Sequence, residues 1–248
     1  MLRFSLGLAV VFAAWWLLSA AAPAGVVPPP EAVLPRLAGL LIGGGLAVHA
    51  AASLLRVAAG LILALGLGVP AGLALGRFKA LDAVFAPAVY LLYPVPKIAL
   101  LPVIILLAGV GEAPKIALLA LVLFFQVLIP ARDAARGLER SYLVSLRSLG
   151  GTDRHLFRFV LLPSLLPGLV SSLRVGTGTA LAVLFFAETF FTRYGLGVFI
   201  VDNWMKAAYV DMFAGIAALG LAGLAVFKLI DLAERLACPW LARTSFGE

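Results

Sequence analysis

Few residues of this chain have the types and spacing that bond-breaking chemistry requires. The sequence contains no Walker lysine motif, no His-Glu-x-x-His and no Cys-x-x-Cys. Its two histidines, His49 and His155, fall in different predicted compartments, so they cannot share a metal ion or form a catalytic dyad. We therefore expect no metal site and no enzymatic activity, ATP hydrolysis included, from this chain alone.

Glu188 is the acidic residue that is predicted to lie well inside a long apolar segment. A buried ionisable group is costly there and indicates a functional site by default. Together with the adjacent Thr189 it could line or gate a pathway. Alternatively, it could pair with Arg174, Lys97 or a neighbouring helix and be structural.

A polar, Arg-rich interlude at 131–163 separates two long hydrophobic stretches. Apolar residues at three-residue steps predict an amphipathic helix in its middle. They are Leu143, Leu146 and Leu149. Gly150 and Gly151 follow, and glycine can take the left-handed conformation that ends a helix.

A second short helix is expected after the glycines. Thr152 with Asp153 is a suitable helix start, and Pro163 with Pro167 should end the helix and turn the chain back. Its apolar face is formed by Leu156, Phe157, Val160 and Leu161. The interlude therefore predicts a docking surface for a soluble partner; the alternative is a solvated loop with incidental amphipathicity.

The composition shows that these segments belong to an integral membrane protein. Hydrophobic residues make up 63% of the 248 residues, charged residues 12%, and the mean hydropathy is +1.11, whereas soluble domains average about 25% charged residues. A crossing needs about 20 apolar residues. We expect an all-α fold with about six crossings, at 4–22, 53–76, 84–108, 114–130, 167–190 and 212–230.

The third of these crossings cannot be one regular helix. It contains Pro87, Pro94, Pro96 and Pro102, and an interior proline removes a backbone donor and clashes with the preceding turn. A broken helix is tolerated in a membrane only where it is buried in protein or lines a wet cavity. The break should therefore border a pathway, with Tyr93, Pro94 and Pro96 as candidate lining residues.

The net charge of +7 is explained by membrane topology. If the N-terminus is cytoplasmic, most basic residues fall in inside loops, as the positive-inside rule requires, where they can also meet anionic lipid headgroups. Nucleic-acid binding is a poor explanation, because the basic residues are interleaved with apolar ones in short loops.

The segment 4–22 is either a retained helix or a cleaved signal peptide. Arg3 and the small residues at 19–22 fit a signal peptide, whereas Trp15 and Trp16 resemble interfacial anchors and favour a retained helix. Cys238 is the sole cysteine, so an intrachain disulfide is impossible. Cysteine usage therefore does not indicate the redox compartment.

Small residues recur at four-residue spacing in the second crossing. Gly68, Gly72 and Gly76 would lie on one helix face, where the lack of side chains lets two backbones approach closely. We expect these glycines to serve helix packing.

The spacing of Gly150, Val160, Leu162 and Pro163 resembles the cytoplasmic EAA loop of permease subunits of binding-protein-dependent ABC importers. Over 53–243, further motifs resemble the nitrate/sulfonate/taurine class. They are Pro94-Val95-Pro96-Lys97, Gly109-Val110-Gly111-Glu112, Leu156-Phe157-Arg158, Ala187-Glu188-Thr189 and Tyr194-Gly195-Leu196-Gly197. The family's Glu-Ala-Ala positions read Val144-Ser145-Leu146, so its acidic residue is missing.

The resemblance implies a type I ABC importer permease in a bacterial cytoplasmic membrane. Residues 1–52 would form the first helix and an outer loop, 53–243 the permease core with the coupling loop 131–163, and 244–248 a cytoplasmic tail. The coupling residues would be Leu143, Leu146, Arg147, Leu149, Gly150, Thr152, Leu156, Phe157, Val160, Leu162 and Pro163.

The implied partners are ATPase subunits that bind ATP and Mg, a second identical or paralogous permease, and an extracytoplasmic solute-binding protein. The implied solute is small and anionic, like nitrate, a sulfonate or taurine, and a bare Glu188 would repel it. Two other functions compete with this interpretation. A secondary transporter or channel should show more intramembrane charges and an inverted repeat, which we do not see. A membrane scaffold subunit would leave the proline-broken segment unexplained.

Overall fold

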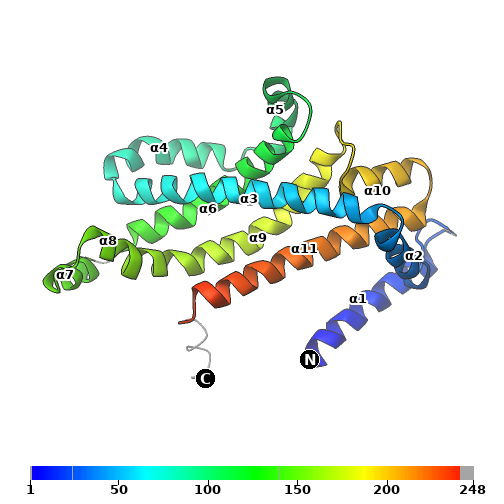
Figure 1. Ribbon diagram of the computed structural model, residues 1–248, viewed down its shortest axis with the longest axis horizontal. Helices are drawn as coiled ribbons and strands as arrows, with labels where there is room; N and C mark the ends of the chain where they lie inside the picture. The colour runs from blue at the N-terminus through cyan, green and yellow to red at the C-terminus, as the bar shows by residue number, and fades with distance from the viewer. Residues whose placement is uncertain (1, 24, 139, 241–248) are drawn as a thin grey trace. The chain divides into compact units, whose positions relative to one another are not determined.

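The computed structural model describes residues 2–23, 25–138 and 140–240, and helices are the only regular elements there (Figure 1). The all-α fold expected from the sequence is confirmed. In chain order the elements are α1 (Leu2–Ala21), α2 (Pro30–Ile42), α3 (Leu46–Arg77), α4 (Lys79–Leu92), the 3-10 helix η1 (Lys97–Leu100), α5 (Leu101–Ala108), α6 (Ala113–Arg136), α7 (Arg140–Ser148), α8 (Asp153–Leu156), the π-helix η2 (Phe157–Leu161), α9 (Leu162–Glu188), α10 (Leu196–Met205) and α11 (Tyr209–Ala237).

Four helices of the described chain are long and apolar enough to cross a membrane. They are α3, α6, the continuous helix Asp153–Glu188 and α11. The pair Lys79–Leu92 and Lys97–Ala108 passes the same test together and adds a fifth span if it counts as one. The remaining expected crossing, at 4–22, corresponds to α1, whose stretch Ser5–Ala21 is a shorter apolar helix.

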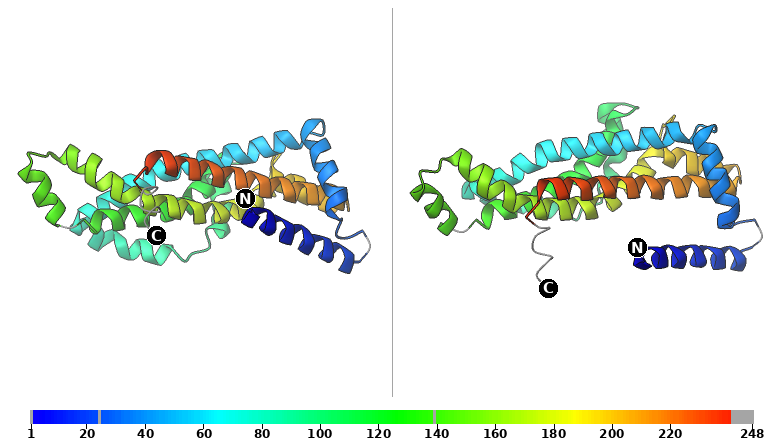
Figure 2. Two further views of the ribbon diagram at one scale, coloured as in Figure 1. Left: turned by 90° about the horizontal axis from the view of Figure 1, so that it is seen from below. Right: turned by 60° about the horizontal axis from the view of Figure 1, so that its bottom comes forward.

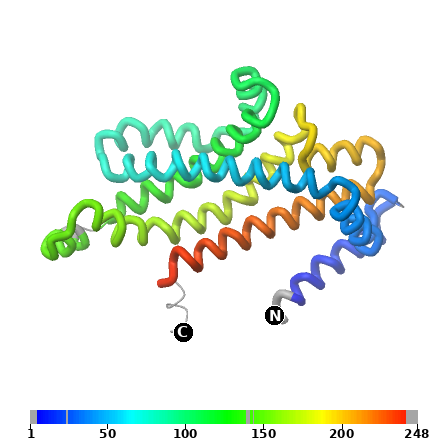
Figure 3. The backbone as a smooth tube through the Cα atoms, in the orientation of Figure 1, coloured from blue at the N-terminus to red at the C-terminus, as the bar shows by residue number. Residues whose placement is uncertain are grey.

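The predicted break in the third crossing is present. The two halves of the pair are bent by 91° at the short segment that holds Pro94 and Pro96, and Figure 3 shows this sharp turn between α4 and α5. Pro102 lies in the first turn of α5, where a missing N–H costs nothing. The Nζ of Lys97 donates to the carbonyl oxygens of Leu92 and Tyr93, which have lost helical partners.

The chain forms two compact units. Unit 1 comprises Met1–Leu55 and Phe185–Ala222, and unit 2 comprises Arg56–Leu184 and Gly223–Glu248. The core of unit 1 is built by α2, α10 and the adjoining parts of α3 and α11, with Val33, Leu46 and Leu196 wholly buried. In the same unit, α1 is held by a hydrogen bond of 3.1 Å from Trp15 Nε1 to the carbonyl oxygen of Pro28.

In unit 2, α3 packs closely against α6 along the glycine stripe. A Cβ added at Gly68 would lie 2.9 Å from Val127 Cγ1, and one at Gly72 would lie 2.4 Å from the carbonyl oxygen of Leu128. At Gly76 the same construction meets the carbonyl oxygen of Arg132 at 2.4 Å. Only glycine permits this approach of the two backbones.

Helix α4 is tied to α6 by a polar contact in unit 2. The largely buried Arg132 donates to Asp82 at 2.9 Å and to the hydroxyl of Tyr90 at 3.0 Å. Arg132 falls in the polar interlude at 131–163 of the sequence, whereas in the structure it lies within α6. The pairing satisfies a charge that would otherwise be costly to bury.

Candidate functional site

The interlude folds into α7 and α8, joined by a turn at Gly150. Gly150 has a φ of +76°, which is the expected left-handed conformation. Its N–H bonds the carbonyl oxygen of Arg147 at 3.0 Å, and the N–H of Gly151 bonds that of Leu146 at 2.9 Å, so the last carbonyls of α7 are satisfied. Thr152 is the N-cap of α8 as predicted, and its N–H donates to His155 Nδ1 at 3.2 Å.

The expectation that the second helix ends at Pro163 is wrong. The helix is continuous from Asp153 to Glu188, and neither Pro163 nor Pro167 breaks it. The physical reason is the π-helix η2, in which the N–H of Leu162 bonds the carbonyl oxygen of Phe157, five residues earlier. This wider turn gives the ring of Pro163 room beside the carbonyl group that it would meet in a regular helix.

The predicted coupling residues do not all face the same way. Leu149 is 86% exposed and Phe157 is half exposed, whereas Leu156 is only 7% exposed and belongs to the core. The residues Arg147, Gly150 and Thr152 are exposed, and Leu146, Val160, Leu162 and Pro163 are half-buried. The side chain of Leu143 lies outside the described ones.

Sequence reasoning left out two further exposed apolar side chains of this region, Val144 and Phe159. The sequence did carry a signal for them, because both are apolar residues that lie off the expected apolar stripe. We call Val144, Leu149, Phe157 and Phe159 the coupling surface. The ribbon views agree that α7, which carries part of it, projects beyond the ends of α6 and α9 within unit 2 (Figure 2).

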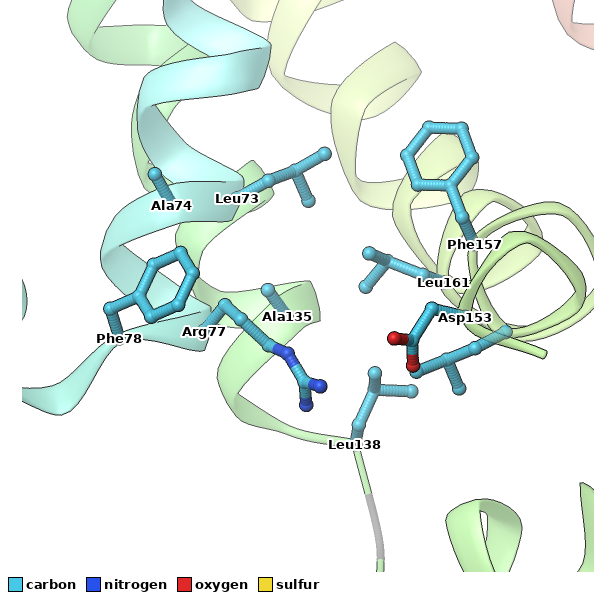
Figure 4. Close-up of a pocket in the computed structure, with 10 residues that line it drawn as sticks. Leu73, Ala74, Arg77, Phe78, Ala135, Leu138, Asp153, Phe157 and Leu161 are labelled. Carbon is cyan, nitrogen blue, oxygen red and sulfur yellow. The ribbon is translucent and has the colours of Figure 1, made fainter. Parts of the chain in front are cut away.

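A pocket of about 500 Å³ lies behind the coupling surface. It is lined by the ends of α3 and α6 and by 153–161, and Figure 4 shows Arg77 and Asp153 turned toward its interior. Its lining residues are Leu73, Ala74, Arg77, Phe78, Ala135, Leu138, Asp153, Leu156, Phe157 and Leu161. The start of the continuous helix is therefore separated from α3 and α6 by open, mostly apolar space.

A second recess, of about 240 Å³, lies between α6, α9 and the break after α4. The structure brings the predicted pathway residue Tyr93 to this recess. Its other lining residues are Phe125, Gln126, Ile129, Pro130, Ser171, Ser172 and Val175. Sequence reasoning missed the polar members, although a glutamine and two adjacent serines inside apolar helices were a visible signal. Pro94 and Pro96 are exposed beside the break and do not line the recess.

Glu188, the other pathway candidate, lies in unit 1 and is 0% exposed. Its carboxylate accepts hydrogen bonds from Ser53 Oγ at 2.7 and 2.9 Å and from the N–H of Gly197 at 2.8 Å. Ser53 Oγ in turn accepts from the N–H of Leu196 at 2.8 Å. The neighbouring Thr189 hydroxyl donates to the carbonyl oxygen of Phe186 at 2.7 Å.

The two cations that the sequence offered as partners for Glu188 bond to other groups. Arg174 donates to Asp231 at 2.6 Å and to Glu234 at 2.7 Å, and Lys97 donates to the backbone, as described above. The carboxylate therefore has a local role at the start of α10, where backbone N–H groups lack helical partners.

A buried arginine that the sequence reading did not single out lies near the start of unit 2. Arg56 is 4% exposed and donates to Glu112 at 2.7 Å, which ties α3 to the loop before α6. The guanidinium group lowers the pKa of the Glu112 carboxyl below its ordinary value, chiefly through this hydrogen bond.

In the described residues no group of three or more His, Cys, Asp or Glu could hold a metal ion.

Comparison with known proteins agrees with this architecture. The chain is 30% identical over 192 residues to the taurine transport system permease protein TauC of Escherichia coli, covering 77% of this chain and 70% of that one. It is 25% identical to the nitrate import permease protein NrtB of Synechocystis, covering 79% and 71%. A solved structure of the MetNI methionine ABC transporter in inward-facing conformations shares the fold, with a TM-score of 0.60 and 20% identity over 75% of this chain and 93% of that one.

Helices long enough to cross a membrane and a proline-broken segment fit a multi-pass transport subunit. The family described as "Binding-protein-dependent transport system inner membrane component" matches residues 60–243, most of the chain. The protein belongs to this family and is a multi-pass inner-membrane permease subunit of an ABC transporter for solute import.

Proposed function

We propose that this permease imports a small anion and that separate ATPase subunits drive it by binding the coupling surface. The observation that carries the proposal is the exposure of Leu149 on a segment that projects from unit 2. Apolar side chains exposed to water cost about 25 cal/mol per Å² of surface, and grouped ones mark interaction sites. A cleft of a partner protein would cover them.

The charge around the coupling surface indicates the character of that cleft. Arg147, Arg154 and Arg158 are exposed beside it, and Val144 stands where the family's loop has an acidic residue. The contact would therefore rest on apolar burial, with arginines that favour carboxylates on the partner. ATP and Mg would be bound by that partner.

The continuous helix offers a route for the motion. A force on α8 would reach the membrane part of α9 along continuous helical backbone, because Asp153–Glu188 is one helix. The pocket of about 500 Å³ gives α8 room to move against α3 and α6. For alternating access, ATP binding in the partner must stabilise one arrangement more than the other.

The remaining partners are proposed from membership of the family. A second copy or a paralogue of this permease would complete the pathway, and a solute-binding protein would deliver the solute on the outer side. Membrane lipid would surround the pair. The solute class, small oxoanions such as nitrate or a sulfonate, is proposed from the taurine and nitrate relatives.

Co-purification with an ATPase tests the coupling. The permease is co-expressed with an ABC ATPase encoded beside it, and Leu149→Asp is compared with the unchanged protein. We expect Leu149→Asp to reduce the recovered ATPase at least tenfold, because burying an unpaired carboxylate in an apolar cleft costs several kcal/mol.

Leu236→Asp is the matched control. It places the same charge on another exposed leucine of unit 2, in the last turn of α11. The ATPase should be retained with this variant. Equal recovery with Leu149→Asp and Leu236→Asp, or no ATPase with the unchanged permease, would refute the proposal.

A further inference from the structure

The recess that contains Tyr93 has polar groups without hydrogen-bond partners. Among the described residues, the hydroxyls of Tyr93, Ser171 and Ser172 make no hydrogen bond, although serines in helices commonly bond a carbonyl one turn earlier. The Oε1 of Gln126 is buried and also has no partner. Four unsatisfied polar side chains thus line one recess in unit 2.

Gln126, Ser171 and Ser172 lie on helices that are long enough to cross the membrane, and Tyr93 lies at the break that follows α4. Hydrocarbon cannot satisfy hydroxyl and amide groups, so polar side chains at this depth face protein or a water-filled cavity. Ser171 and Val175 are exposed in the isolated chain. In the assembled transporter this face must therefore border water, solute or protein.

The chemistry of the recess favours an anion. Three of its polar lining groups are hydroxyls, which can donate hydrogen bonds, and none of its described lining residues is acidic. The Nζ of Lys97 lies 5.2 Å from the ring centroid of Tyr93 and 4.7 Å from that of Phe125, and both rings line the recess. A positive charge thus stands beside donors that have no partner.

The Lys97 ammonium group keeps capacity for a ligand. It has three N–H donors, and among the described residues it uses two of them on the carbonyl oxygens of Leu92 and Tyr93. These bonds hold it at the break after α4. An anion in the recess would feel this charge strongly, because electrostatic attraction increases where water is excluded.

We propose that this recess is an intramembrane binding site for a small oxoanion such as nitrate or a sulfonate group. The hydroxyls of Ser171, Ser172 and Tyr93 donate hydrogen bonds to its oxygens, and Lys97 supplies the charge. The inference rests on the proposed import function and names the part of this chain that handles the solute. The recess holds about eight water volumes, which suits a solute of a few heavy atoms.

Cysteine labelling with charged reagents tests the site on the full chain in nanodiscs. Cys238, the sole cysteine, is first replaced by serine. Ser171→Cys and Ser172→Cys are then labelled with 2-sulfonatoethyl methanethiosulfonate, which carries a sulfonate, and with its trimethylammonium analogue. Ser164→Cys is the matched control, because Ser164 is exposed two turns earlier on the same helix and outside the recess.

We expect Lys97→Met to lower the ratio of anionic to cationic labelling rates at positions 171 and 172 about fivefold or more, as removal of a nearby charge requires. The ratio at position 164 should not change, and Lys97→Arg should retain the preference. Nitrate or methanesulfonate should slow labelling at 171 and 172, whereas choline should not. An unchanged Tm of each variant in nanodiscs shows that it is folded.

A ratio at 171 and 172 that does not respond to Lys97→Met, or that changes equally at 164, would overturn the anion site. Absence of protection by both nitrate and methanesulfonate would also overturn it. These measurements need no ATPase. If the permease binds its ATPase but fails these labelling tests, only the anion site is disproved. If it passes the labelling tests but binds no ATPase, only the coupling is disproved.

Discussion

A carboxylate enclosed by protein needs hydrogen-bond donors, because burial removes the water that would otherwise solvate it. Glu188 obtains them from Ser53 and from the backbone of Gly197. With Ser53 it satisfies the first N–H groups of α10, as capping side chains do. The sequence identifies Glu188 as unusual, but not this role, because Ser53 is 135 positions away in the chain.

Removal of this carboxylate should destabilise the protein. Glu188→Ala leaves the Gly197 N–H and the Ser53 hydroxyl without their acceptor, and we expect the free energy of unfolding to fall by about 2 kcal/mol. Glu188→Gln keeps one acceptor oxygen and should lose less. Thermal unfolding in detergent, followed by intrinsic fluorescence, measures both effects.

Asp202→Ala is the control for this experiment. Asp202 forms an exposed pair with Lys206 within α10, and such pairs contribute less than about 1 kcal/mol. A Glu188→Ala protein as stable as Asp202→Ala would show that the buried hydrogen bonds contribute nothing. The hypothesis that Glu188 lines or gates a pathway would then remain.

At the scale of helices, the contact between α3 and α6 depends on the absence of side chains at a few positions. Gly72→Ala would place a Cβ 2.4 Å from the carbonyl oxygen of Leu128 and 2.6 Å from the Cβ of Ala131. Because backbone atoms cannot yield as a flexible side chain can, we expect a loss of about 1–3 kcal/mol in unfolding free energy, again measured by thermal unfolding.

Gly66→Ala is the matched control on the same helix. A Cβ at Gly66 meets no atom within 4 Å, so the change should stabilise α3 by about 0.5–1 kcal/mol through its higher helix propensity. Equal effects of the two substitutions on the unfolding free energy would mean that the close packing of α3 against α6 does not depend on the glycine stripe.

The elements were largely predictable from local sequence. Composition predicted the long apolar helices, and Pro94 with Pro96 predicted the break. Each of these predictions depends only on residues within one segment of the chain. The continuity of the helix through Pro163 was not predictable, since it depends on the widened turn at Phe157–Leu161. Pro167 likewise lies inside α9 without ending it, so a proline in the sequence does not by itself locate a helix end.

The candidate site was only partly predictable for a similar reason. Tyr93 followed from the broken segment, whereas Gln126 and Ser172 become relevant only because α6 and α9 bring them to the same recess. Likewise, the contact of Arg56 with Glu112 joins residues 56 positions apart. A single sequence shows which polar residues are unusual, but the packing of helices decides which of them meet.

For the molecule as a whole, the continuous helix relates the coupling surface to the recess. Phe157 of the coupling surface and Ser172 of the recess lie on this helix, and both belong to unit 2. A stiff helix moves both ends together, whereas a hinge between them would let the coupling surface move alone. The proposed coupling therefore requires stiffness between positions 157 and 171.

Softening the helix in this interval should uncouple ATP hydrolysis from transport. Leu162→Gly with Ser164→Gly introduces two glycines, each of which costs about 1 kcal/mol of helix stability, beside the π-helix η2. The ATPase should still bind, because the coupling surface is unchanged. In proteoliposomes that contain the complete complex, we expect hydrolysis to continue while solute uptake per ATP falls severalfold.

The control places the same two glycines in another long helix of unit 2, as Ala225→Gly with Leu229→Gly at exposed positions of α11. This helix does not continue into α8, so its softening should change stability but not uptake per ATP. An unchanged ratio in the α9 variant, or an equal fall in both variants, would show that the motion does not travel along Asp153–Glu188. In that case the motion of α8 would have to reach α3 and α6 across the pocket behind the coupling surface, into which Arg77 and Asp153 are turned.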